Sequence, residues 1–329
     1  MSELATAPAT PSRAELESRL EDHRRELSGY CYRMLGAAFE TDDAVQETMV
    51  RAWRALDKFD GRSSLRTWLY RIATNVCLDS LNSRNRRALP MDFGPASPPV
   101  AESLGQPRPE ATWIQPMPDG EVLSPTADPA DLAIQRDSVR LAFIAALQHL
   151  PARQRVVLIL REVLRWSAAE VAELLDTTVA SVNSALQRAR ATITEVDEDA
   201  DRSAGPIDDA QKVLLDDYVK AFTSYDIDAL VQLLRKDATA SMPPFALWLD
   251  GRDDIAAWHL GPGHACRHGK LVPLAVNGSP AFAAYKLSPD GSHLPFSIQV
   301  LDLDGDRIAR ITYFLDPSLF ARFGLPPKL

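Results

Sequence analysis

The chain has 329 residues, 46% of them hydrophobic and 25% charged, with a net charge of −9. This length predicts two or three domains, and the composition is typical of a soluble globular protein. No run of about 18 apolar residues is present, which excludes a transmembrane helix, and the Ala/Thr/Pro-rich N-terminus is unlike a secretory signal. Cys31, Cys77 and Cys266 are far apart, so we expect no disulfide framework, no metal site, no cofactor and a reducing, cytoplasmic setting.

The charge is distributed unevenly. Residues 13–90 and residues 131–194 each carry a net charge of +2, whereas residues 91–130 carry −5 and residues 195–329 carry −7. Binding to a polyanion requires a local basic face and not a basic average. The acidic total therefore does not exclude binding to nucleic acid.

Two stretches divide the chain. Residues 90–129 hold 10 of the 24 prolines; because proline lacks an amide donor and disfavours helix in the residue before it, we expect an extended acidic linker there. Residues 195–205 form an acidic run that should be solvated. The sequence thus predicts four parts: a helical block at 13–89, a linker at 90–130, a second helical block at 131–194 and a third block at 206–329.

Helical spacing of apolar residues marks the first block. Residues from Val45 through Met49, Trp53 and Leu56 recur every three or four positions, and the same spacing returns from Leu65 to Val76. An Asp-Gly turn separates the two runs. We therefore expect two amphipathic helices joined by a short polar loop.

The second block contains the pattern of a helix-turn-helix. Ser167 and Glu170 form a capping box, and Val182, Leu186 and Ala189 of a second helix face inward. Polar residues remain on its outer face: Ser181, Asn183, Ser184, Gln187, Arg188 and Arg190. Asn and Gln suit adenine edges and Arg suits guanine or phosphate, so DNA binding is predicted; an ordinary solvated helix hairpin is the alternative.

The third block has mixed secondary structure. An amphipathic helix is expected around 209–234, and Asp304-Gly305-Asp306 is a hairpin signal between two alternating runs. The strand-like runs are 238–242, 246–249, 271–276, 281–287, 296–303 and 308–314. An α+β domain is therefore predicted.

Residues 42–87 and 150–190 resemble the second and fourth conserved regions of bacterial sigma factors, in particular the extracytoplasmic-function (ECF) group of the sigma-70 family. The motifs at 217–244, 250–258 and 298–317 resemble the SnoaL-like group of the NTF2-like superfold. Together they resemble the sigma-G type of sigma factor. The fold class implied is multidomain: two all-α domains, the second a helix-turn-helix, and a C-terminal α+β NTF2-like cone.

The resemblance implies promoter recognition without catalysis. A sigma factor binds the RNA polymerase core, through the coiled coil of its largest subunit and through the flap, and directs it to promoters carrying −10 and −35 elements. Asp43, Gln46 and Glu47 match the family's contact with the coiled coil. They lie opposite the apolar positions of their helix; a solvated acidic face is the alternative interpretation.

The family's −10 contacts match a loop and the helix after it. A polar loop receives a base flipped from the duplex, and aromatic rings stack on exposed bases. The matching residues are Phe59, Arg62, Ser63, Ser64, Trp68, Tyr70, Arg71, Asn75 and Asp79. Trp68 is equally compatible with a core position, and Arg84, Arg86 and Arg87 form a basic run suited to phosphates. The −35 contacts match the six outward residues of the helix-turn-helix.

The role of the third block is open at this point. A pocket in the cone would bind a small ligand or regulator and modulate the sigma regions in cis. Residues able to act as general acid or base are Asp226, Asp250, His259, His264, His268 and Asp316. Two alternatives remain: a helix-turn-helix regulator independent of polymerase, and a SnoaL-like isomerase or cyclase on a DNA-binding adaptor.

Overall fold

The structure, a computed structural model, describes residues 13–82, 86–124, 127–196 and 207–329. Its contacts divide the chain into two compact units. The first unit comprises Met1–Arg84 and Leu150–Thr192, and the second comprises Asn85–His149 and Ile193–Leu329. The proline-rich segment thus belongs with the C-terminal part of the chain.

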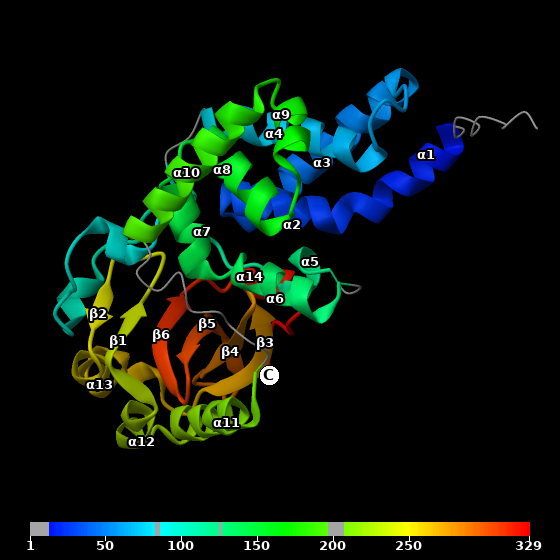
Figure 1. Ribbon diagram of the computed structural model, residues 1–329. Helices are drawn as coiled ribbons and strands as arrows, with labels where there is room; N and C mark the ends of the chain where they lie inside the picture. Colours follow the sequence, from blue (N-terminus) through cyan, green and yellow to red (C-terminus); the bar gives the residue numbers. More distant parts are fainter. Residues whose placement is uncertain (1–12, 83–85, 125–126, 197–206) are drawn as a thin grey trace, which may run out of the picture. The chain divides into compact units, whose positions relative to one another are not determined.

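The first unit is helical (Figure 1). Its α-helices are α1 (Arg13–Leu20), α2 (Arg24–Leu35), α3 (Ala38–Ala55), α4 (Leu65–Asn82), α8 (Ala152–Leu158), α9 (Ala168–Leu174) and α10 (Val179–Val196). Gly36 ends α2 in the left-handed conformation (φ 70°), which glycine adopts without strain. Leu27, Val45 and Leu69 are among the buried residues. Trp53, expected on the apolar face of α3, is instead 53% exposed.

The second unit contains a six-stranded sheet in the order β2-β1-β6-β5-β4-β3. The strands are β1 (Leu234–Ser241), β2 (Trp248–Asp250), β3 (Lys270–Val276), β4 (Ser279–Leu287), β5 (His293–Asp304) and β6 (Arg307–Phe314). All six strand predictions are confirmed, as is the hairpin at Gly305. The single helix expected at 209–234 is two helices, because Tyr225 adopts φ 58° and Asp226 caps the second.

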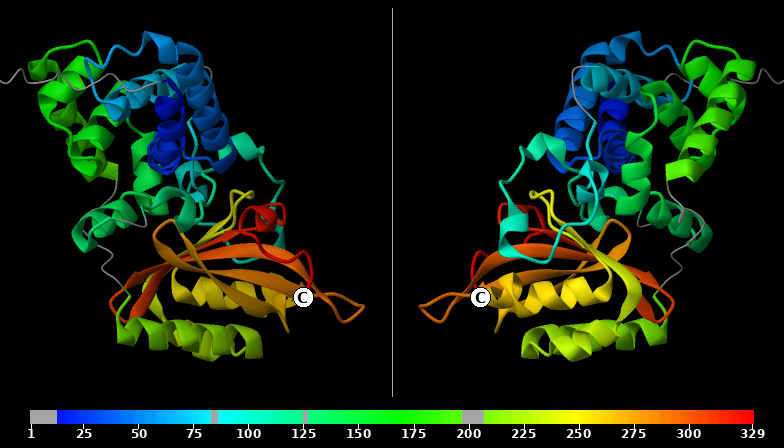
Figure 2. Two further views of the ribbon diagram at one scale, coloured as in Figure 1. Left: turned by 90° about the vertical axis from the view of Figure 1, so that its right-hand side faces the viewer. Right: turned by 90° about the vertical axis from the view of Figure 1, so that its left-hand side faces the viewer.

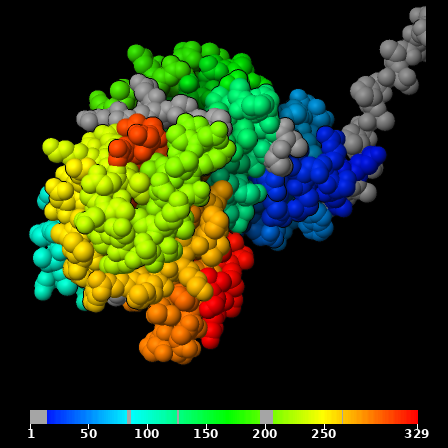
Figure 3. All heavy atoms as spheres, turned by 90° about the horizontal axis from the view of Figure 1, so that it is seen from below, coloured from blue at the N-terminus to red at the C-terminus, as the bar shows by residue number. Residues whose placement is uncertain are grey.

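Three helices cover one face of this sheet (Figure 2): α11 (Asp209–Ser224), α12 (Ile227–Gln232) and α13 (Arg252–Leu260). Tyr218 and Phe222 of α11 and Trp258 of α13 join Phe282 and Tyr313 of the sheet in one hydrophobic core. In Figure 3, α11 and α12 form the yellow-green surface of the C-terminal part, next to the orange strands. This is the cone expected from the NTF2-like resemblance.

The proline-rich segment is folded, which differs from the extended linker expected from the sequence. It contains short 3₁₀ helices, and α5 (Asp119–Val122), α6 (Pro129–Asp137) and α7 (Leu141–Gln148) follow them. Trp113 and Met117 are buried. The proline-rich segment therefore lacks long regular helices but is still folded, because its apolar side chains are buried.

An Asn-Gly turn between β3 and β4 holds this segment. The Asn277 side-chain oxygen accepts a hydrogen bond from Met117 N (2.8 Å), and its amide nitrogen donates to Val139 O (2.6 Å). Gly278 N donates to Asp119 Oδ1 (2.7 Å). A Cβ on Gly278 would lie 2.6 Å from Arg136 O, so only glycine fits there. One turn of the cone thus forms hydrogen bonds with three residues of the chain between 117 and 139.

Candidate nucleic-acid interface

Helix α10 presents the outer face predicted for the helix-turn-helix. Its six predicted −35 residues are all exposed, and Val182, Leu186 and Ala189 on the opposite side are buried. Thr178 Oγ1 accepts a hydrogen bond from Ser181 N (3.1 Å), which caps the helix as expected. Arg190 forms an ion pair with Glu162 at 2.6 Å.

The helix before it, α9, begins with the predicted capping box. Glu170 N donates to Ser167 Oγ (3.2 Å), and Ser167 N donates to the Glu170 carboxylate (2.7 Å). Hydrogen bonding of the Glu170 carboxylate with the Ser167 side chain and with the Ser167 backbone lowers the pKa of Glu170. Asp176 in the turn adopts φ 49°, a conformation that aspartate tolerates better than most residues. The local sequence therefore fixes the relative orientation of α9 and α10.

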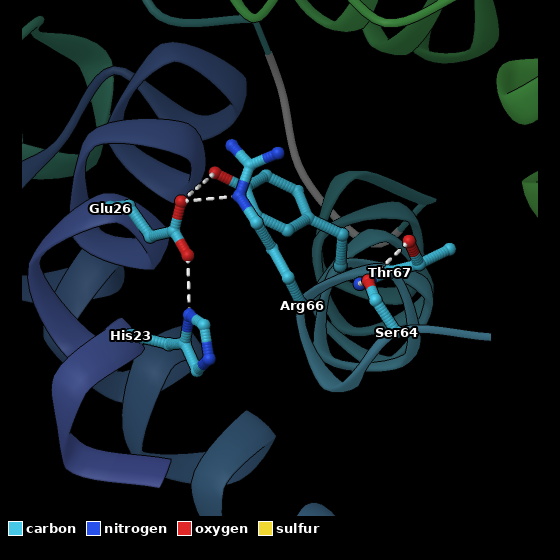
Figure 4. Close-up of polar contacts among 6 residues, drawn as sticks. His23, Glu26, Ser64, Arg66 and Thr67 are labelled. Carbon is cyan, nitrogen blue, oxygen red and sulfur yellow. Dashed lines mark hydrogen bonds and ion pairs between the residues drawn. The ribbon is translucent and has the colours of Figure 1, made fainter. Parts of the chain in front are cut away.

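A second cap positions the loop before α4. Thr67 N donates to Ser64 Oγ (3.0 Å), so Ser64 begins the helix and ends the loop (Figure 4). In the loop, Asp60 accepts hydrogen bonds from the backbone and side chain of Arg62. The rings of Phe59 and Trp68 pack at 5.3 Å between centroids. These contacts hold a polar loop between the packed rings of Phe59 and Trp68 and the first residue of α4.

A partly buried carboxylate braces α4 against α2. Glu26 accepts a hydrogen bond from Arg66 Nε (2.7 Å) and contacts His23 Nδ1 (2.6 Å), as Figure 4 shows. Burial raises the pKa of Glu26. The hydrogen bond with His23 and the charge of Arg66 together lower it by more than burial raises it, so the pKa lies below the ordinary value. The sequence analysis did not identify this brace, since no local pattern links residues 40 positions apart.

The structure separates the nine predicted −10 residues by exposure. Those exposed are Arg62, Ser64, Asn75 and Asp79, and those partly buried are Phe59, Ser63, Trp68 and Arg71. Asn75 and Asp79 lie one turn apart on the same face of α4, as expected. Tyr70 is fully buried, so its ring is not presented for stacking, contrary to the prediction.

Tyr70 is covered by the helix-turn-helix region of the same unit. The Arg66 guanidinium lies over the Tyr70 ring (5.0 Å) and the Trp166 ring (5.6 Å), and the two rings are 5.3 Å apart. Arg71 Nη2 donates to the backbone oxygen of Glu173 on α9 (3.3 Å). The −10-matching face of α4 is therefore partly occupied by an intramolecular contact.

An exposed acidic face on α3 carries the predicted polymerase contacts. Asp43, Gln46 and Glu47 are exposed, and Glu47 pairs with Arg51 at 2.6 Å. Gln46 also lines a groove of about 400 Å³ between α1 and α3, together with the exposed Trp53. Aromatic side chains are enriched in protein interfaces, and the exposure of Trp53 was not predicted because this residue fits the apolar helical repeat.

Of the basic run after α4, Arg87 is not accessible to phosphate in the structure, whereas Arg86 is exposed. Arg87 is buried and donates to Glu110 O (3.1 Å) and to Trp113 O in the proline-rich segment. Arg86 contacts His149 (2.7 Å) and Asp92 (3.6 Å). Arg84 lies outside the described residues. The folded segment thus uses two of these arginines as internal donors.

Of the candidate acid and base residues in the C-terminal cone, His259 is the one that lines its internal cavity. Burial lowers the pKa of His259 to about 4. Its Nε2 lies 3.4 Å from Tyr313 Oη. Asp226 is the N-cap of α12 and accepts from Ala229 N (2.9 Å), the structural role that the sequence allowed.

The depressed pKa of His259 predicts a loss of stability in acid. The unfolded residue titrates near 6.5, so it takes up a proton as the pH falls toward the folded pKa while the folded residue stays neutral. The unfolding free energy is expected to drop by about 2 kcal/mol between pH 7 and pH 5 through this residue. Chemical denaturation of the wild type and of His259→Phe at both pH values measures it. Equal pH dependence in the two proteins would contradict the expectation.

Two helical modules, one a helix-turn-helix with an exposed polar face, define a DNA-binding protein. Residues 20–87 match the family Sigma-70 region 2, and residues 140–193 match Sigma-70, region 4. Over 326 residues the chain is 45% identical to the ECF RNA polymerase sigma factor SigG of Mycobacterium tuberculosis, covering 98% of this chain and 87% of that one. It is 31% identical over 154 residues to the ECF RNA polymerase sigma-E factor of Escherichia coli, covering 47% and 72%.

The fold of nearly the whole chain also matches a solved structure. The crystal structure of the M. tuberculosis ECF sigma factor SigJ superposes with a TM-score of 0.61 at 21% identity, covering 94% of this chain and 99% of that one. The chain belongs to the ECF RNA polymerase sigma factors. Sigma factors bind the polymerase core and promoter DNA, and they are initiation factors and not enzymes. In the described part of the chain no helix has the length and apolarity to span a membrane.

Proposed function

We propose that the acidic face of α3 binds the coiled coil of the polymerase's largest subunit, with the flap as a further contact of the helix-turn-helix module, in the cytoplasm. The supporting observation is the exposure of Asp43, Gln46 and Glu47 beside the α1–α3 groove. Carboxylates on a preformed helix face pair well with a basic partner helix at little entropic cost. The loop before α4 and the exposed face of α4 then read the −10 element.

The −35 element is read by α10. Asn183 and Gln187 lie one turn apart on its exposed face, where two amide side chains reach neighbouring base edges. Arg188 supplies a contact with phosphate or guanine. Because sigma factors change no covalent bond, the work of these residues is differential binding of one promoter over another.

Promoter binding requires the two helical modules to separate. Elements named −10 and −35 are about 25 base pairs apart, or about 85 Å along the duplex at about 3.4 Å per base pair. In the structure Arg71 of α4 touches Glu173 of α9. One unit with this contact intact cannot span that distance, so polymerase must hold the modules apart, which uncovers Arg71 and Tyr70.

The C-terminal cone modulates promoter use in cis through the segment that it holds. Segment 86–149 joins the two sigma modules in sequence and is fixed to the cone at Asn277 and Gly278. A cone tied to this segment has a high effective concentration at the sigma modules. Whether the cone holds the segment tightly or loosely therefore influences how readily the two sigma modules move apart.

Run-off transcription with purified core polymerase tests the main function. Added to core enzyme on fragmented genomic DNA, the full-length protein is expected to yield transcripts that start at a restricted set of sites sharing −10 and −35 sequences. Start sites that are unchanged by the protein, together with failure to co-elute with core enzyme, would contradict the proposal. Sequence-specific DNA binding without core enzyme would favour a polymerase-independent regulator instead.

The Asn277→Gly variant tests modulation in cis. It keeps the positive φ of this turn (56°) but leaves the buried Met117 N–H without its acceptor, a loss of about 1–3 kcal/mol. We expect faster amide exchange at Met117 and at least a twofold change in transcript yield. Asn82→Gly, at the exposed end of α4, is the control. Faster exchange with unchanged yield would exclude a regulatory role for this attachment.

A chain cut after residue 202 is a poorer test of the same idea. Removing the cone would expose Trp113, Ile114 and Met117, which are almost fully buried in the intact protein. Their apolar surface favours aggregation, so lost activity in the truncated chain could not be assigned to lost regulation.

A further inference from the structure

The C-terminal cone contains a partly open cavity of about 410 Å³. This volume lies within the range of sites that bind small molecules, about 300–1,000 Å³. Aromatic and aliphatic side chains dominate its lining: Phe222, Met242, Phe245, Trp258, Phe296, Tyr313 and Leu315. Several flat rings around one space favour a ligand with a planar apolar body.

Two polar groups in the cavity are suited to a ligand. His259 is buried, and its Nδ1 has no hydrogen-bond partner among the described residues. A buried polar atom without a partner costs free energy that a hydrogen bond from a ligand would recover. Lys286 alone is charged among the described lining residues, and its ammonium lies 5.5 Å from the centre of the Phe296 ring. The cavity therefore favours an anion over a cation.

The proline-rich segment covers part of this cavity. Leu104 lines it and packs against the hydrophobic core of the cone. The segment is attached on both sides of Leu104, because Ser97 N donates to Trp248 O (2.8 Å) and Arg108 N donates to Pro244 O (2.9 Å). Residues 97–108 thus form a strap that is fixed at two backbone points with one apolar side chain inserted between them.

We propose that this cavity binds a small planar aromatic molecule with an acidic group, and that the strap at 97–108 closes over it. The apolar body lies among the rings, the acidic group pairs with Lys286, and a polar atom of the ligand bonds to His259 Nδ1. Since the strap belongs to the segment between the two sigma modules, the occupied cavity restrains that segment. Binding itself does not depend on the proposed modulation in cis, so the two can be tested separately.

Titration with 8-anilinonaphthalene-1-sulfonate, an aromatic anion with a flat naphthalene ring, tests the site in the full-length protein. We expect one saturable site, at least tenfold weaker binding in Lys286→Gln, and no change in Lys328→Gln, which removes an exposed charge outside the cavity lining. Uncharged N-phenyl-1-naphthylamine should bind Lys286→Gln and the wild type equally. Multiple weak sites, or equal dye binding by Lys286→Gln and the wild type, would overturn the proposal.

Hydrogen exchange tests the strap. Dye binding is expected to slow exchange at the amides of Ser97 and Arg108 at least fivefold, and Leu104→Ala is expected to speed dye dissociation because the cavity loses its inserted side chain. Leu104→Ala changes a partly buried residue, so we expect it to fold. Unchanged exchange at both amides together with unchanged dissociation would remove the strap from the proposal. Transcript yields with and without dye then report separately on modulation in cis.

Discussion

Replacing Asp43 and Glu47 by lysine is expected to weaken binding to core polymerase at least 100-fold. Both carboxylates are exposed on α3, and each charged hydrogen bond with a basic partner contributes about 1.5–3 kcal/mol. Two such bonds contribute at least about 3 kcal/mol, or roughly a hundredfold, and reversal adds repulsion because it places like charges opposite each other. Size-exclusion co-elution and fluorescence anisotropy with labelled protein measure this loss.

The control for this variant is Asp209→Lys with Asp216→Lys on α11 of the cone. Both doubles change the net charge by the same amount, and each breaks one surface ion pair, since Glu47 pairs with Arg51 (2.6 Å) and Asp209 pairs with Lys212 (2.8 Å). Such exposed pairs add little to stability. Equal weakening in both doubles would show a general charge effect and not a contact made by α3.

Much of the fold follows from local patterns in the sequence. The capping box of α9, the six strands and the hairpin at Gly305 depend on residues within a few positions of each other, and the prediction of each is confirmed. The break between α11 and α12 was missed because the hydrophobic repeat continues through Tyr225, and the left-handed conformation of that residue leaves no mark on the periodicity.

The remaining differences come from contacts between distant segments. Tyr70 has the sequence position of a stacking aromatic, yet Trp166, almost a hundred residues later, covers it. The proline content of 90–129 predicts an extended chain, but it carries no information about the acceptor that Asn277 offers to Met117. The pair Asn277-Gly278 between two strand-like runs is a strong hairpin signal, but it was not among the predicted turns, and it does not indicate what the turn binds. Local sequence determines the helices, strands and turns, whereas the exposure of the candidate DNA-binding residues depends on packing between distant segments.

The contact between α4 and α9 in the first unit affects how the proposed DNA-binding residues of that unit should be tested. Arg71 is held by Glu173 across the two modules, so separation of α4 from α9 would free it for the proposed contact with DNA. Arg190 pairs with Glu162 inside the second module, and DNA would have to replace that partner directly. Exposed ion pairs of this kind cost little to break. Affinity of the free protein for DNA therefore underestimates what these residues contribute in the polymerase complex, and variants are best compared in holoenzyme.

Alanine at both Asn183 and Gln187 is expected to abolish discrimination between promoters that differ in the −35 element. Both side chains are exposed on α10, one turn apart, and each bidentate contact with a base contributes about 1–3 kcal/mol of discrimination. The double variant should therefore lose about 30-fold to about 20,000-fold in preference over a scrambled −35 sequence. Competition for holoenzyme between two labelled promoters measures the ratio directly.

Arg188→Ala is the matched contrast on the same exposed face of α10. If Arg188 contacts phosphate, its loss weakens both promoters about equally and reduces the dependence of log K on log salt by about one. If it reads guanine, the promoter ratio changes and the salt slope falls too. Glu195→Gln, exposed near the end of α10, should leave ratio and slope unchanged. An unaltered ratio in the Asn183→Ala, Gln187→Ala protein would rule out base reading by these two residues and leave Arg188 as the residue of this face to be tested for it.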